Sequence, residues 1–433
     1  MLAEVLKFMV EAGRAQEPSE SQVKVQVSLA ASLHEVVAHI GAGPGVEGLL
    51  KALLESEQEE VQRAVARNLH KTLSRYWEQL GAAGAGGYRR ELAFEGLLHS
   101  VRVLESSLKR RGWREHVELV GALPRLQLLF GGAPAFCDAF YAHLWDYMRH
   151  GFRDTKLAAA EAFARLLHND FRSGVRAKFM RRVVEEFRHS PSCYDRALFV
   201  HFCGVAAEAY SRALFHDYGL YEAFLGLAAD GVVDVQLRFL ETAPAVRKAL
   251  SAEDDTHSVV RLLDCIALLT NSELKRVSDA AIDCELQLSH AKYRDPTIVA
   301  KLDQENRSKL SHERNLELLE KEAELEQQIA RANQRSASSL FSASASFAAE
   351  PAPPRLPLQA PAPKKPRGGG PPKKTAPPPR WPLSVSPLAD SKAGGGGGAG
   401  SGGKAGAAAG GGDKTFSSFI SDAGRRNSSY SKK

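Results

Sequence analysis

Apolar side chains recur along residues 1–295 with the spacing of one helix face, and the pattern repeats about every forty residues. The first two copies align over residues 25–34 and 61–70, with apolar residues at i, i+4 and i+8. Further copies begin near 115, 156, 195, 235 and 275, so the steps are 36, 54, 41, 39, 40 and 40 residues. Self-similarity at this period is typical of stacked helical repeats, which bury their apolar faces against their neighbours. The pattern therefore predicts an all-α solenoid.

Each repeat is expected to hold two helices, an A helix and a B helix, joined by a short polar turn. Acidic residues at the ends of these turns suit the positive end of the following helix dipole. The longest step contains a glycine-rich run at 81–87, which predicts a flexible insertion between pairs. The clearest expected pairs are 46–54 with 61–73, 140–150 with 156–167, and 220–228 with 235–250.

Composition divides the chain into three parts. Residues 1–295 form the predicted solenoid, and the apolar face at its start is consistent with repeats missing upstream. Residues 296–335 are rich in Glu, Lys, Gln and Leu and predict one long charged helix. Leu318 and Leu325 are a heptad apart without a sustained heptad pattern, so a solvated single helix and a short coiled coil both remain open. Residues 336–433 are rich in Ala, Ser, Pro and Gly and predict a disordered tail.

Charge follows the same division. The chain carries +6, and residues 336–433 contribute +10 through 14 Lys/Arg and 4 Asp/Glu, so the body carries −4. The basic character therefore gives no reason to expect a specific nucleic-acid groove on the folded part. The sequence holds no apolar run of membrane-spanning length, so no membrane partner is expected. Five cysteines without a CxxC pair indicate small buried hydrophobic residues in a reducing compartment.

Catalytic motifs do not emerge from the sequence. HExxH, GxSxG and GxxxxGK[ST] are missing, and the histidines are scattered. We therefore expect no catalytic residues, metal, cofactor or small-molecule substrate. Trp113 is a candidate for a contact with a partner protein, because it lies beside Arg114 in a predicted turn and both residue types are frequent at interface hot spots. The alternative is that Trp113 packs across its own repeat.

A family resemblance rests on two stretches. Gly112-Trp113-Arg114, followed by Val117, Val120 and Leu123-Pro124, resembles a repeat of the HEAT-repeat scaffold and regulatory subunits of protein phosphatases 2A and 4. Residues 183–207, with the run Arg196-Ala197-Leu198-Phe199-Val200, are similar to the regulatory subunits of protein phosphatase 4. Turns in the family tend to read Trp-Arg-Val-Arg, whereas Glu115 and His116 follow Trp113-Arg114 here.

The resemblance covers residues from about 20 to 290 and implies a HEAT-repeat α–α superhelix. It implies a non-catalytic subunit that binds the catalytic subunit of a protein phosphatase 4 or 2A-type enzyme and directs it to substrates. The residues expected to contact that partner are Trp113, Arg114, Arg153, Asp154 and Asp234. The alternative function is an adaptor for nuclear transport or the cytoskeleton built on the same repeats, although mixed or acidic turns argue against tubulin.

The tail adds candidate signals. A basic cluster is either an import signal or a solubilising linker, and it comprises Lys364, Lys365, Arg367, Lys373 and Lys374. Ser386 precedes a proline and Ser428 follows two arginines, so both are candidate phosphorylation sites. A kinase and an import receptor are therefore further candidate partners. We expect a cytoplasmic protein, and a nuclear one as well if the import signal is used.

Overall fold

The computed structural model describes residues 19–82, 87–132, 134–250, 255–289 and 295–346, and every regular element within these ranges is a helix. This confirms the predicted all-α class. The candidate import signal at 364–374 and the candidate phosphorylation sites Ser386 and Ser428 lie outside the described residues. None of the helices in the described ranges is long and apolar enough to cross a membrane.

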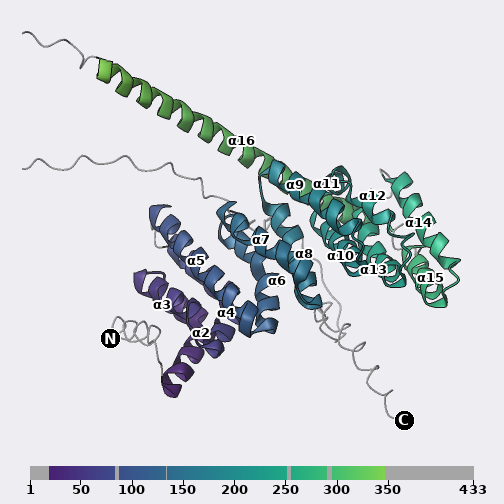
Figure 1. Ribbon diagram of the computed structural model, residues 1–433, viewed down its shortest axis with the longest axis horizontal. Coiled ribbons are helices and arrows are strands. Elements are labelled where there is room, and N and C mark those ends of the chain that lie inside the picture. Colours follow the sequence, from purple (N-terminus) through teal and green to yellow (C-terminus); the bar gives the residue numbers. More distant parts are fainter. Residues whose placement is uncertain (1–18, 83–86, 133, 251–254, 290–294, 347–433) are drawn as a thin grey trace, which may run out of the picture. The chain divides into compact units, whose positions relative to one another are not determined.

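The B helices stack in chain order, each against the next (Figure 1). Their starts recur at close to the predicted spacing, which confirms the repeat. An acidic residue stands in the first turn of most of them, where it suits the helix dipole. The B helices are α2 (Glu20–Ile40), α4 (Glu59–Ala82), α6 (Trp113–Leu129), α8 (Arg153–Asn169), α10 (Cys193–Ala209), α13 (Val233–Ala249) and α15 (Lys275–Ser289).

The A helices precede their B partners along the chain. Of the predicted glycine-rich insertion at 81–87, Gly81 and Ala82 belong to α4 and Gly87 begins α5, and residues 83–86 lie outside the described residues. The A helices are α3 (Pro44–Leu54), α5 (Gly87–Arg111), α7 (Pro134–His150), α9 (Ser173–Val183) with its π-helical end η1 (Val184–Arg188), α11 (Arg212–Asp217) with α12 (Leu220–Leu225), and α14 (Thr256–Thr270).

One continuous apolar core runs between the two rows of helices. Phe199 and Phe202 of α10 are fully buried in it, and Tyr141 and Trp145 of α7 nearly so. All five cysteines are free, and burial, the largest influence, raises the pKa of the Cys137 thiol to about 12. Burying each large side chain contributes roughly 2 kcal/mol, so stacking along the whole row supplies the stability that a single pair lacks.

The long helix α16 (Pro296–Ser346) packs on the repeats along its first half. Leu316 and Glu313 are buried there, and Leu302 joins the core. Leu318 is exposed although it lies within this half, and Leu325 and Ile329 beyond it are exposed as well. The sequence left open a solvated single helix and a short coiled coil for this segment. Neither describes the first half of α16, because its polar side chains bond the starts of α9 and α11. The helix also continues past residue 335 to Ser346, through an Ala/Ser-rich stretch that sequence composition had assigned to the tail.

Candidate functional site

The five residues expected to contact a partner all lie in the first turns of B helices. Trp113 and Arg114 begin α6, Arg153 and Asp154 begin α8, and Asp234 is in the first turn of α13. The sequence placed them in the turns before these helices, but the helices begin two to three residues earlier than predicted. No side chain caps these three helices, and their acidic residues lie within the first turn, where they suit the helix dipole. All five side chains are exposed.

Trp113 presents about half of its surface to solvent, with 51% exposed. The Arg114 guanidinium carbon lies 4.6 Å from the centre of the indole ring, within range of a cation–π contact. An exposed aromatic ring with an arginine over it has the composition of an interface anchor.

Glu115 and His116, which follow Trp113-Arg114, have a structural role. Glu115 turns inward, where its Oε1 accepts a hydrogen bond of 2.9 Å from Arg67 of α4. His116 is buried and lies 2.9 Å from Oε1 of Glu105 in α5. Both residues bind α6 to its neighbouring helices, α4 and α5. Trp113 and Arg114 are therefore the exposed side chains at the start of α6.

Two further exposed aromatic residues stand at the starts of the next two B helices. Phe152, the residue before α8, is 85% exposed, and Tyr194, the second residue of α10, is 78% exposed. We call Trp113, Phe152 and Tyr194 the aromatic edge. Since α6 contacts α8 and α8 contacts α10, the three rings stand on consecutive repeats.

Sequence reasoning missed Phe152 and Tyr194, although a repeated motif marked the first of them. Arg110-Arg111-Gly112-Trp113-Arg114 and Arg149-His150-Gly151-Phe152-Arg153 share one pattern, 39 residues apart. The glycine has a packing reason: a Cβ on Gly151 would lie 2.5 Å from the carbonyl oxygen of Tyr147, so a larger residue would not allow this turn. The third copy, before Tyr194, lacks the glycine.

The aromatic edge carries more unpaired positive than negative charge. Within the described ranges, Arg114 and Arg153 make no ion pair, and Asp154 is the exposed acid beside them. Arg149 is paired with Glu186, and Asp195 is held 3.1 Å from Lys156. Asp234 begins the next B helix, where no strongly exposed aromatic side chain of the described chain accompanies it.

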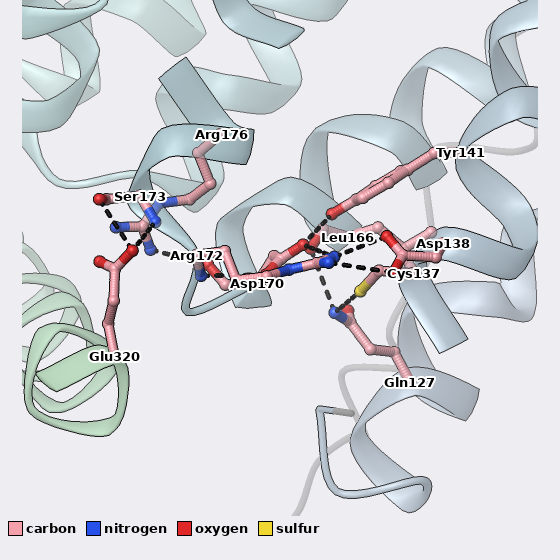
Figure 2. Close-up of polar contacts among 10 residues, drawn as sticks. All are labelled: Gln127, Cys137, Asp138, Tyr141, Leu166, Asp170, Arg172, Ser173, Arg176 and Glu320. Atoms are coloured by element: carbon pink, nitrogen blue, oxygen red, sulfur yellow. Dashed lines mark hydrogen bonds and ion pairs between the residues drawn. The ribbon is translucent and has the colours of Figure 1, made fainter. Parts of the chain in front are cut away.

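Two networks centred on buried carboxylates join neighbouring helices, one at the end of α8, opposite the aromatic edge, and one near the end of α5. Figure 2 shows the first: Asp170 accepts hydrogen bonds from Tyr141 of α7 at 2.8 Å and from Arg172, whose guanidinium also reaches Asp138. In the second, Glu105 is bonded by His116, His143 and Tyr147. Burial alone would raise the pKa of Glu105, but these hydrogen bonds outweigh it and lower the pKa to about 2.

Asp170 and Glu105, the carboxylates at the centre of the two networks, are each only 1% exposed. Their side chains are satisfied by one another and by helix ends, which is the arrangement of structural clusters in a helical core. Among the described residues, no group of three or more His, Cys, Asp and Glu side chains is placed to hold a metal ion.

A row of stacked helix pairs whose turns form an exposed edge defines a HEAT-type helical-repeat protein. No family model matches the sequence. Over 259 residues the chain is 22% identical to serine/threonine-protein phosphatase 4 regulatory subunit 4 of Mus musculus, and 21% identical to its Homo sapiens counterpart. The match covers 59% of this chain and 29% of each relative, so the chain spans less than a third of their length.

Among solved structures, the archaeal HEAT-like repeats protein from Thermococcus onnurineus NA1 is similar at 12% identity and a TM-score of 0.35. That match covers 68% of this chain and 98% of the archaeal one. A computationally designed armadillo repeat protein is similar at 12% identity and a TM-score of 0.26, covering 66% of this chain and all of the designed one.

Proposed function

We propose that this chain is a non-catalytic regulatory or scaffold subunit of a Ser/Thr protein phosphatase, and that its aromatic edge contacts the catalytic subunit. The observation that carries the proposal is the row of exposed rings, Trp113, Phe152 and Tyr194, on the starts of three consecutive B helices. The similarity to regulatory subunits of protein phosphatase 4 supports the choice of partner.

The physical support comes from what an aromatic ring does at an interface. An exposed ring of this size costs little to order, because it has only two side-chain torsions, and it buries a large area when a partner covers it. Three rings on stacked helices form a surface that is held rigid by the core beneath. Such a surface suits a large folded partner, which would supply the catalytic residues and any metal ions.

Truncation of Trp113 tests the proposal. A desolvated tryptophan anchor contributes about 2–4 kcal/mol, so Trp113→Ala should weaken binding to a purified phosphatase 4 or 2A-type catalytic subunit at least about tenfold. The affinity would be measured by biolayer interferometry. Circular dichroism should be unchanged, because the ring is half exposed.

Leu128→Ala is the matched control. Leu128 lies at the other end of α6 and is 59% exposed, so its truncation removes a similarly accessible apolar side chain away from the aromatic edge. We expect this variant to bind as the unmodified chain does. Full affinity in the folded Trp113→Ala variant would exclude this edge as the contact.

A further inference from the structure

We propose that the contact between α16 and the repeats is a pH-dependent switch, in which protonation of His168 and His312 in mildly acidic solution releases the first half of α16. We call His168, His312 and Glu313 the histidine junction. The junction lies at the end of α8, whereas the aromatic edge lies at the starts of B helices. The switch therefore does not depend on the proposed function.

The two imidazole rings of the histidine junction come from segments that are far apart in the sequence. His168 stands in the last turn of α8 and His312 in the first half of α16, and their ring centres are 5.0 Å apart. The side chain of His168 is 12% exposed, and its Nε2 atom is buried without a hydrogen-bond partner in the described part of the chain. A change of charge on either ring therefore acts directly on the contact between α8 and α16.

A first proton is accommodated on His168. Oε1 of Glu313 lies 3.6 Å from Nε2 of His168, which is long for a hydrogen bond but within reach of an ion pair once the ring is charged. The same oxygen accepts from the backbone N–H of Ser211 at 2.7 Å, so the carboxylate is held in place. Tyr210 stacks on His168 with ring centres 5.1 Å apart, and an aromatic face also attracts a cation.

A second proton, on His312, meets a neutral acceptor instead of a carboxylate. Nε2 of His312 lies 3.2 Å from Oδ1 of Asn169. The amide nitrogen of Asn169 donates to Gln127 at 3.3 Å, so this hydrogen bond assigns the amide oxygen to His312. An amide oxygen accepts a hydrogen bond from the neutral ring as well as from the charged one, so it offers little compensation for a buried positive charge.

The charged groups around His312 come from three helices. His168 belongs to α8, the buried Arg176 belongs to α9, and Glu313 follows His312 on α16 itself. When both rings are charged, the two imidazolium groups and Arg176 share the carboxylate of Glu313, so the rings repel each other at 5.0 Å. One turn earlier on α16 lie a lysine and the two further acids that act on it, Lys309, Glu208 and Glu305.

The sign of the pH dependence follows from His312. Burial, the largest influence, lowers the pKa of His312 below 6.5, and His168 and Arg176 act in the same direction, whereas Glu313 opposes them. Docked α16 therefore favours a neutral His312, and in released α16 the ring regains a pKa of about 6.5. The contact keeps its full stability above about pH 6.5 and loses it progressively as the pH falls below that value.

The carboxylate of the junction stays charged over the same range. Burial, the largest influence, would raise the pKa of Glu313, but His168 and the N–H of Ser211 outweigh it and lower the pKa below 4.5. A loss of contact between pH 7.5 and pH 5.5 therefore reports on histidine and not on Glu313.

Other buried histidines should not produce this response. His116 and His143 bond Glu105, so a proton on either adds an attractive charge to its partner. Burial, the largest influence, lowers the pKa of His201 to about 4, so its ring stays neutral at pH 5.5.

Hydrogen exchange of the full chain at pH 7.5 and pH 5.5, followed by mass spectrometry, tests the switch. Protection factors are compared, because they remove the intrinsic effect of pH on the exchange chemistry. A histidine with a pKa of about 6.5 is roughly 90% charged at pH 5.5, so protection of residues 302–320 should fall about five- to tenfold. Protection in α4 and α6 should not change.

Variants assign the response to the junction. His312→Gln keeps an N–H for Asn169 and carries no charge at either pH, so the fall in protection should disappear even if the contact is weaker at both pH values. His168→Gln removes the repulsion between the rings and should reduce the fall. His150→Gln is the matched control: it changes an exposed histidine at the end of α7 and should keep the full fall.

The outcomes that would overturn the inference are specific. Equal protection of residues 302–320 at the two pH values in the unmodified chain would exclude the switch. A fall that persists in His312→Gln would assign the response to other groups, as would a fall that disappears in His150→Gln. A loss of protection in α4 and α6 as large as that in α16 would place the effect of acid on the repeats instead of on the contact.

Discussion

At the scale of single residues, two buried carboxylates, Asp170 and Glu105, hold neighbouring helices together through hydrogen bonds. Asp170 follows the end of α8 and joins Tyr141 of α7 to Arg172, and the backbone carbonyl of Asp170 accepts from Arg176 of α9 (Figure 2). Glu105 does the same for α5, α6 and α7. Because each carboxylate accepts hydrogen bonds from more than one segment, its loss should destabilise more than one helix.

Asp170→Asn should destabilise the protein by about 3 kcal/mol, because Arg172 and Tyr141 lose their charged partner. The estimate lies at the lower end of the range for a broken buried pair, since the Arg172 side chain is 24% exposed. Chemical denaturation followed by circular dichroism would measure the loss. Asp138→Asn is the control: Asp138 also bonds Arg172 but is 60% exposed, so it should cost less than about 1 kcal/mol. Equal losses in the two variants would contradict a special role for burial.

Glu105 predicts a pH dependence with a definite sign. Its pKa is lowered from 4.5 to about 2 in the fold, so its stabilising effect is complete above about pH 4.5 and disappears as the pH falls through about 2. The free energy involved is about 3 kcal/mol. Denaturation midpoints at pH 7 and pH 3 should therefore differ less in Glu105→Gln than in the unmodified chain. Glu118→Gln, an exposed change on α6, should keep the original difference.

At the scale of elements, α16 holds the repeats through acceptors that meet helix starts. Glu313 accepts from the backbone N–H of Ser211 at 2.7 Å, and Glu320 accepts from that of Ser173 at 2.8 Å. Asn306 accepts from the N–H of Arg212 at 2.9 Å. Asn306, Glu313 and Glu320 follow one another at intervals of seven residues, which is close to two helical turns, so they lie on one face of α16. The first half of α16 therefore replaces solvent at the starts of α9 and α11.

Removing the two carboxylates should release α16 without unfolding the repeats. Each charged hydrogen bond to a backbone N–H contributes about 1.5–3 kcal/mol, so Glu313→Ala with Glu320→Ala should raise hydrogen exchange across residues 302–320 and at Ser173. Exchange in α4 and α6 should stay as it is. Glu322→Ala with Glu324→Ala changes two exposed glutamates of the same helix and should alter neither region. Unchanged exchange at 302–320 would show that apolar contacts such as Leu316 suffice.

At the scale of the whole molecule, the row of B helices makes stability a shared property. Each B helix contacts the B helices before and after it, and the buried side chains form one core cluster from α2 to α15. A repeat that loses a core side chain should therefore weaken its neighbours as well, because most of each repeat's stability comes from the contacts between repeats.

Phe199→Ala tests this coupling. Phe199 is fully buried in α10, and truncating a buried phenylalanine costs about 3–5 kcal/mol. Hydrogen exchange should rise in α8 and α13 as well as in α10. Tyr194→Ala, which changes a 78% exposed residue of the same helix, should leave all three helices as protected as before. A rise confined to α10 would mean that the repeats unfold independently.

The helical class, the repeat and most of the helix pairing were predictable from the amino-acid pattern. These follow from local rules: a face of apolar residues at helical spacing and a period of about forty residues leave few other ways to bury the apolar surface. The core positions of Phe199, Phe202, Tyr141 and Trp145 were predictable for the same reason. Helix starts were less predictable, because Trp113 and Arg153 belong to helices that begin without a capping side chain.

The outward-facing side chains at the repeat edge and the position of α16 depend on contacts between distant parts of the chain. In the sequence, Glu115 and His116 differ from the Trp-Arg-Val-Arg turn pattern. In the structure both are buried, because Glu115 bonds Arg67 of α4 and His116 bonds Glu105 of α5. Phe152 and Tyr194 were not singled out from the sequence, and their exposure depends on where the helices α8 and α10 start. The partners of Glu313 and Glu320 are about 100 residues or more away in sequence, beyond the reach of any periodicity. Such contacts arise only when distant segments meet, so they are a property of the packed molecule.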